Sequence, residues 1–193
     1  MILNIESPEH KEKIEALRIA RLVSRAQEGE AAAFGVLYEE HEGRVFRYIL
    51  ARTGQVELAE DLTQEVFVRA LDSIGQYSDR GYQFSSWLLR IAHNLIIDHR
   101  RSAAEKHPSV ELDEAQPASD DDPVAEVEKR EQIARVLKAV PGLTPGQREV
   151  ISLRFGAGLH LAEAAAVMGR SLGAVKMLQH QAIAKLRRML GAK

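Results

Sequence analysis

The most informative absence in this 193-residue sequence is cysteine, of which there is none. The chain therefore forms no disulfide, builds no thiolate zinc site and has no cysteine nucleophile, as is typical of proteins of a reducing compartment. Aromatic residues are scarce, at 5%. The sequence also lacks an alternating run of β-branched residues, which would predict a strand. Hydrophobic residues reach 45% and recur at helical spacing, which predicts an all-α fold with packed cores.

An excess of charge of one sign is missing as well. The 26 basic and 28 acidic residues leave a net charge of -2, so total charge does not indicate a nucleic-acid-binding protein. Residues 1–20 carry charges every few positions and hold no uninterrupted apolar core, which excludes a signal peptide or membrane span there. We therefore expect a cytoplasmic protein without membrane insertion, in which any nucleic-acid signal is local.

Signatures of catalysis are also lacking. The sequence has no Gly-rich phosphate loop, no histidine pair at metal-ligand spacing, and no nucleophile with a recognisable base. The run from Asp120 to Asp122 could bind a cation weakly, but a solvated linker is the better interpretation. We expect no catalytic residue, no metal and no cofactor, and a protein that is not an enzyme.

The periodicity of apolar residues predicts four helices in the first half of the chain. These helices are expected near 9–28, 31–52, 57–74 and 83–101, with breaks at Gly29, at Thr53-Gly54 and in the polar segment 75–81. Composition then changes, because residues 108–128 hold eight acidic residues, three prolines and no Lys or Arg. Such a segment is typical of a flexible linker.

Helical periodicity resumes near Val124 and continues to about Val140. Beyond it, Thr144 is placed to cap a helix that has Pro145 at its first position and Gln147 at its third. The chain is thus predicted to form two helical domains on an acidic tether. The predicted ranges are an N-terminal extension at 1–20, a first domain at 21–103, a linker at 104–123 and a second domain at 124–193.

The second domain contains a helix-turn-helix pattern. A short helix is expected from Leu161 to Met168, with a turn at Gly169 and a longer helix capped by Ser171. No acidic residue occurs between Ala164 and Lys193, although several Lys and Arg do, and this one-sided charge favours DNA binding over a purely structural helical hairpin.

A helical wheel divides the faces of this longer helix. One face is apolar, and the other is expected to reach base edges in the major groove, although a solvated surface is an equally good interpretation of His180. The candidates for contacts with bases and phosphates are Arg170, Ser171, Gly173, Lys176, Met177, His180, Arg187 and Arg188.

Two helices of the first domain carry patterned exposed faces. Opposite a predicted apolar stripe, the third helix presents Asp61, Gln64, Glu65, Val68 and Asp72. A solvated helix surface is the default interpretation of this face.

The fourth helix presents a cationic, amide-bearing and partly apolar line that suits phosphates and an unstacked base. That line holds Ser86, Arg90, Asn94, Ile97 and Arg101. Trp87 borders it and is better interpreted as a core anchor than as a base-stacking platform.

Taken in order, these segments resemble the extracytoplasmic function (ECF) group of sigma-70-like factors. AAFGVLYEEHEGRVFRYIL resembles the opening of the sigma-2 domain, ELAEDLTQEVFVRAL its polymerase-binding helix, and FSSWLLRIAHNLIIDHRR its promoter-opening helix. PGLTPGQREVISLRF and the helix-turn-helix resemble the sigma-4 domain. The resemblance covers nearly the whole of residues 22–190, although Met177 stands where the family usually has a small polar residue.

The resemblance implies a role for each face. The face that includes Asp61, Gln64 and Glu65 would bind the clamp helices of the polymerase β′ subunit. The fourth helix, with Trp87 and Arg100 added to its line, would contact the -10 element, and the segment 75–83 would capture a flipped base. The helix-turn-helix would read the -35 element while its domain rests on the β flap. The implied partners are core RNA polymerase and promoter DNA, and an anti-sigma factor is a further candidate.

One alternative function remains open on the sequence alone. A dimeric helix-turn-helix repressor or activator with an N-terminal sensing domain would share the second half of the pattern. The two differ in partnership, since a repressor binds duplex operator alone and a sigma factor needs core polymerase.

Overall fold

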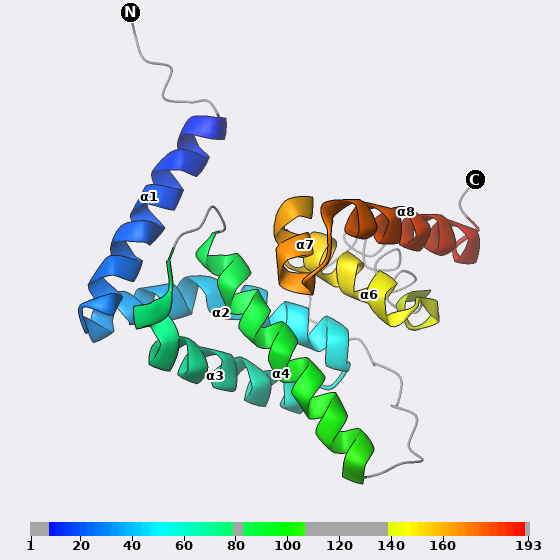
Figure 1. Ribbon diagram of the computed structural model, residues 1–193, viewed down its shortest axis with the longest axis horizontal. Coiled ribbons are helices and arrows are strands. Elements are labelled where there is room, and N and C mark those ends of the chain that lie inside the picture. Colours follow the sequence, from blue (N-terminus) through cyan, green and yellow to red (C-terminus); the bar gives the residue numbers. More distant parts are fainter. Residues whose placement is uncertain (1–7, 79–82, 107–138, 192–193) are drawn as a thin grey trace, which may run out of the picture.

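A computed structural model describes residues 8–78, 83–106 and 139–191, and every regular element within these ranges is helical (Figure 1). The all-α prediction is therefore confirmed. The linker predicted at 104–123 and the helical segment predicted from Val124 lie almost entirely outside the described residues, as do residues 79–82 of the segment expected to capture a base.

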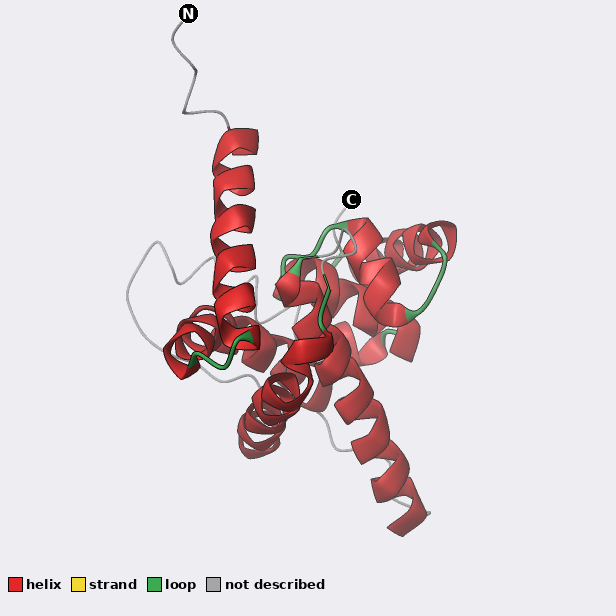
Figure 2. Ribbon diagram, turned by 60° about the vertical axis from the view of Figure 1, so that its left-hand side comes forward, coloured by secondary structure: helices red, strands yellow, loops and turns green. Residues whose placement is uncertain are grey.

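Four helices form the N-terminal domain. They are α1 (Pro8–Gln27), α2 (Ala31–Thr53), α3 (Val56–Ser73) and α4 (Phe84–Lys106), with a short 3-10 turn at Ile74–Gln76 after α3. Each pairs with a helix expected from periodicity, and the boundaries differ by five residues at most. Helix α1 is continuous through residue 20, where the sequence predicts the end of an extension, and it projects from the rest of the molecule (Figure 2).

The break between α2 and α3 shows how a local signal ends a helix. Gly54 takes a left-handed conformation with φ of 73°, which residues with a Cβ rarely adopt. Its N–H donates to the Leu50 carbonyl at 2.8 Å, which satisfies one of the carbonyls left free at the helix end. The chain can then reverse and pack α3 along α2.

The core of this domain lies between α2, α3 and α4. Tyr48, Ile49, Leu88 and Leu89 are fully buried there, and the apolar stripe predicted on α3 is buried at Leu62, Val66 and Ala70. Removing such side chains from water is the main stabilising contribution of the domain.

The C-terminal domain is built from shorter elements. A 3-10 turn at Val140–Gly142 precedes α6 (Pro145–Ile151), a π-helical turn at Ser152–Gly156, α7 (Leu161–Met168) and α8 (Leu172–Met189). The predicted cap of α6 is confirmed as a capping box, in which the Gln147 N–H donates to the Thr144 hydroxyl and the Thr144 N–H donates to the Gln147 side chain.

The two domains pack against each other, which the prediction of two domains on a tether does not include. Helix α7 lies against α4, and the π-helical turn lies against α2. Buried residues of both domains, among them Leu88, Leu89, Leu153 and Val167, belong to one continuous hydrophobic cluster. We call the contact of α6, α7 and the π-helical turn with α2 and α4 the interdomain interface.

Candidate functional site

Helices α7 and α8 have the predicted helix-turn-helix geometry. Gly169 ends α7 in the left-handed conformation, with φ of 60°. Ser171 caps α8 by accepting a hydrogen bond from the Ala174 N–H at 3.3 Å. Val175, Ala182 and Leu186 are buried, so the opposite face of α8 points to solvent. Met189 is 47% exposed and lies in the last turn of α8.

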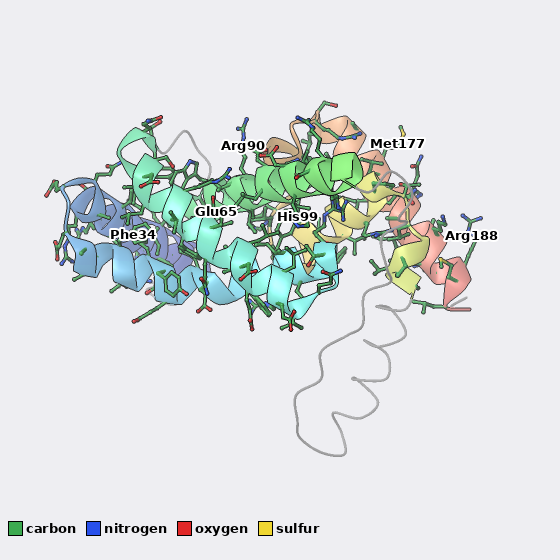
Figure 3. All side chains as sticks on the ribbon, turned by 90° about the horizontal axis from the view of Figure 1, so that it is seen from below. Phe34, Glu65, Arg90, His99, Met177 and Arg188 are labelled. Carbon is green, nitrogen blue, oxygen red and sulfur yellow. The ribbon has the colours of Figure 1, made fainter. Side chains whose placement is uncertain are left out.

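The residues predicted for upstream DNA contact are all exposed. The Met177 side chain is 63% exposed, and Figure 3 shows it projecting from α8, with Arg188 near the far end of the same helix. The other exposed members of the set are Arg170, Ser171, Gly173, Lys176, His180 and Arg187. An acid-free helix with an exposed cationic face is suited to the phosphates of duplex DNA.

The predicted face of α3 is also on the surface. Asp61, Gln64 and Asp72 are exposed and Val68 is 55% exposed. Glu65 is partly covered and accepts a hydrogen bond from Arg69 at 2.7 Å, an i,i+4 pair on the same helix. An exposed valine beside carboxylates and an amide gives this face both an apolar contact and hydrogen-bonding groups for a protein partner.

The predicted line on α4 is only partly exposed. Arg90, Asn94, Ile97 and Arg101 face solvent, and Figure 3 shows Arg90 pointing away from the helix bundle. Arg100 is half-buried and donates to the Arg52 carbonyl at 2.6 Å.

Ser86 departs from the expectation that it is presented along this line. It is 3% exposed, and its hydroxyl donates to a carboxylate oxygen of Glu163 at 3.0 Å. The physical reason is that α7 of the C-terminal domain lies over the first turn of α4.

Trp87 has the predicted character of a core anchor. Its ring lies 5.1 Å from Tyr77 and 5.4 Å from Phe84, in tilted arrangements that favour aromatic pairs. One side of the ring remains accessible, because Trp87, Arg90 and Ala166 help to line a cavity of about 310 Å³ at the edge of the interdomain interface.

Charged groups gather in the interdomain interface, where cations outnumber anions. Burial, together with the charges of Arg52 and Arg148, lowers the pKa of Arg100. Burial and Arg52 likewise lower the pKa of Arg148. Opposing them is Glu149: burial alone would raise the pKa of its carboxyl, but the contact with His93 Nδ1 and the charge of Arg52 lower it overall.

Sequence reasoning missed the residues of this interface. Glu149 and Glu163 lie on the inner faces of α6 and α7 and are buried next to Val150 and Ala164. Acidic residues on the apolar side of a helical pattern are the signal that could have found them, since buried carboxylates require partners.

No helix in the part of the chain that the structure describes is long and apolar enough to cross a membrane. In the same ranges, no cluster of three or more His, Asp or Glu side chains could hold a metal ion.

The chain matches known proteins over both of its domains. Two family descriptions match, "Sigma-70 region 2" over residues 37–106 and "Sigma-70, region 4" over residues 139–188. The chain is 40% identical over 181 residues to the ECF RNA polymerase sigma factor BldN of Streptomyces coelicolor, a match that covers 91% of this chain and 67% of that protein. It is 34% identical over 180 residues to the ECF RNA polymerase sigma factor ShbA of Streptomyces griseus, over 88% of this chain and 93% of ShbA.

Solved structures give the same fold. CnrH, in complex with the cytosolic domain of CnrY, matches with a TM-score of 0.67 and 28% identity over 89% of this chain and 96% of CnrH. The sigma factor RpoE from Bartonella quintana, in complex with the anti-sigma factor NepR, matches with a TM-score of 0.70 over 83% of this chain and 98% of RpoE. At 20% identity, that second likeness concerns the fold alone.

Proposed function

Because this chain belongs to the ECF group of sigma-70-family RNA polymerase sigma factors, we propose how its exposed faces divide the work of transcription initiation. The protein is an alternative sigma factor that directs RNA polymerase to promoters. The rival function, a dimeric repressor or activator acting without polymerase, is not favoured, because both sigma-70 regions match and in the family's order. The role is regulatory, and we assign it no catalytic step and no cofactor.

The α3 face is the proposed site for core polymerase. Asp61, Gln64, Val68 and Asp72 are solvent-facing and Glu65 is partly so, and they lie outside the interdomain interface. In the family this stretch contacts the β′ clamp helices. The partner works in the cytoplasm, which is therefore the proposed compartment.

The -10 and -35 promoter elements are assigned to different domains of the protein. Helix α4, through Arg90, Asn94 and Arg101, is the proposed contact for the -10 element, and Trp87, Ile97 and Arg100 border it. Helix α8, through Lys176, Met177 and His180, is the proposed reader of the -35 element, while the same domain rests on the β flap. The observation that carries this division is the exposure of acid-free, patterned residues on α8 in the matched region 4.

A protein inhibitor is a further proposed partner. CnrH, a structural relative at 28% identity, was solved with the cytosolic domain of CnrY. A cytosolic partner that binds the free factor before polymerase does would fit this pattern, and we propose an anti-sigma factor in that role.

A gel shift with and without core polymerase tests the function directly. The protein alone should leave promoter duplex unshifted, and the protein with core enzyme should shift it. Replacing Asp61 and Gln64 with Ala should weaken core association while the free energy of unfolding stays within about 0.5 kcal/mol of wild type, because both side chains are exposed. Specific binding of promoter DNA without core polymerase would contradict the proposal. If the Asp61 and Gln64 variant associates with core as wild type does, the α3 face is an ordinary solvated surface.

A further inference from the structure

We propose that Gln27, the last residue of α1, is a positioning residue for promoter opening. Its side chain holds the turn in which segment 75–83 begins, and through that turn it places Tyr77 against α4. This inference rests on the proposed function, because that segment is the one to which the family resemblance assigns the capture of a flipped base. Gln27 itself precedes residues 37–106, the range that matches Sigma-70 region 2.

The side-chain amide of Gln27 donates two hydrogen bonds to the backbone that follows α3. Its Nε2 lies 2.9 Å from the Ile74 carbonyl oxygen and 2.8 Å from the Tyr77 carbonyl oxygen. The amide nitrogen carries two hydrogens, so one side chain can serve both carbonyls. The Ile74 carbonyl also accepts the Tyr77 N–H at 3.0 Å, which closes the 3-10 turn. Gln27 therefore fixes this turn at its first residue and at the residue after it.

This turn is where the chain leaves helical geometry. The backbone is extended at Tyr77, with φ of -66° and ψ of 131°, so the direction of the following segment is set there. The end of α1 lies beside the turn (Figure 1). On the inner side, Ile74 is 5% exposed and anchors the turn in the hydrophobic core. The Tyr77 backbone has no such apolar anchor of its own, and the bond from Gln27 ties it to α1.

Tyr77 transmits this fixed position to α4. Its ring lies 5.5 Å from Phe84, edge to face, and 5.1 Å from Trp87, distances at which aromatic rings attract one another. Tyr77, Trp87 and Arg90 line the same cavity of about 310 Å³. A shift of the Tyr77 backbone would therefore move a ring that lies directly beside the proposed contact with the -10 element.

A purely structural role for Gln27 makes a different prediction. If the two hydrogen bonds only stabilised the fold, their loss would lower every activity of the protein in proportion to the folded fraction. A positioning residue, by contrast, affects the step in which the unstacked strand is held and leaves duplex binding unchanged. The ratio of opened to closed promoter complex therefore distinguishes the two roles.

The free protein offers a direct reading of this contact, because Trp87 is the only tryptophan in the chain. Gln27→Met removes the donor at nearly the same side-chain length. We expect the Trp87 emission to move to longer wavelength, and the acrylamide quenching constant to rise roughly twofold, since local opening of the turn uncovers one side of the ring. Gln27→Lys keeps a nitrogen with enough hydrogens for both carbonyls and should restore the wild-type spectrum.

The same variants are then combined with core polymerase and promoter DNA. Gln27→Met should form the closed complex as wild type does and yield about tenfold less permanganate-reactive promoter, the fold-change that corresponds to two ordinary hydrogen bonds. Gln27→Lys should recover opening. Glu28→Met introduces the same side chain at the next position, which is also exposed, and should match wild type in both assays. Urea unfolding sets conditions in which all four proteins are folded.

Each outcome bears on a separate claim. Wild-type fluorescence in Gln27→Met would show that the side chain does not hold Tyr77, and normal opening in that variant would show that holding Tyr77 is not needed; either result overturns the inference. Equal losses of closed and opened complex, or no recovery with Gln27→Lys, overturn it as well. If the wild-type protein with core polymerase fails to open any promoter, the proposed function itself is refuted, whereas the fluorescence of the free protein still reports whether Gln27 holds the turn.

Discussion

The two proposed DNA-binding helices differ in how far their surfaces depend on the rest of the protein. Helix α8 presents its set on an exposed face backed by a small core, and no residue of that set is buried. Helix α4 starts its line at a buried serine, continues through a half-buried tryptophan and ends near an arginine bonded to α2. The α8 surface can therefore be changed without affecting the fold, whereas the α4 line is tied to the core at Ser86, Trp87 and Arg100 and is exposed only at its other positions.

The largest expected effect tests this difference through stability. Trp87→Ala should lower the free energy of unfolding by about 2 to 3 kcal/mol, because it removes a ring packed on Tyr77 and Phe84. Met177→Ala on α8 should stay within about 0.5 kcal/mol of wild type, since its side chain is 63% exposed. Urea unfolding followed by circular dichroism measures both, and equal losses would remove the distinction between the helices.

A somewhat smaller effect is expected from pH. Burial and the nearby Arg44 lower the pKa of His41 to about 4, and its ring lies 5.4 Å from Phe84 at the start of α4. Between about pH 6.5 and pH 4 the unfolded chain takes up a proton that the folded chain refuses, so stability falls as pH falls through this window.

The contribution of His41 should be about 2 kcal/mol over that window, and His41→Gln should remove it. Comparing urea unfolding of the two proteins at pH 7, 5.5 and 4.5 isolates this contribution from that of the carboxylates. Parallel pH dependences in wild type and variant would mean that the pKa of His41 is the same in the folded and unfolded states.

Variants of the two proposed DNA-binding helices should also differ in the step of promoter recognition that they impair. Lys176→Ala with His180→Ala should weaken closed-complex formation by about tenfold or more, since each good contact with a base edge contributes about 1 to 3 kcal/mol. Asn94→Ala should leave the closed complex intact and impair opening, because the proposed role of its side chain is to contact an unstacked strand. Permanganate footprinting of unpaired thymines tells these apart, and equal defects in closed-complex formation would refute the division of labour.

The smallest expected change is in DNA specificity, the ratio of the affinities for cognate and random duplex. Arg187→Ala with Arg188→Ala should weaken DNA binding of the polymerase complex about equally for cognate and random duplex. The slope of log affinity against log salt should fall by up to about 0.9 for each phosphate that the variant no longer neutralises. Titrations at several salt concentrations give both quantities. A weakening confined to cognate DNA would mean that these arginines contact bases.

The sequence predicted what is decided locally. Gly54, the Thr144 capping box and the Ser171 cap each act within four residues, so they could be identified from neighbours in the chain. The exposed faces of α3 and α8 also follow from helical periodicity alone. The burial of Ser86 was not predictable in this way, because its partner Glu163 lies 77 residues further along and belongs to the other domain. How two domains pack depends on the complementarity of whole surfaces, which no short pattern records.

Glu163 serves two elements at once. Its Oε2 accepts a hydrogen bond from the His160 N–H at 2.7 Å at the start of α7, while Oε1 accepts the Ser86 hydroxyl. The contact with Ser86 joins the two domains, whereas the contact with His160 lies within α7, so the N-terminal cap of α7 does not depend on the interdomain hydrogen bond. This arrangement also narrows the mutational choices at position 163. Gln can accept from the His160 N–H through its amide oxygen and donate to the Ser86 hydroxyl through its amide nitrogen, whereas Asp is too short to span both partners and Ala removes both contacts. A library selected for folded protein should therefore return mainly Glu and Gln there.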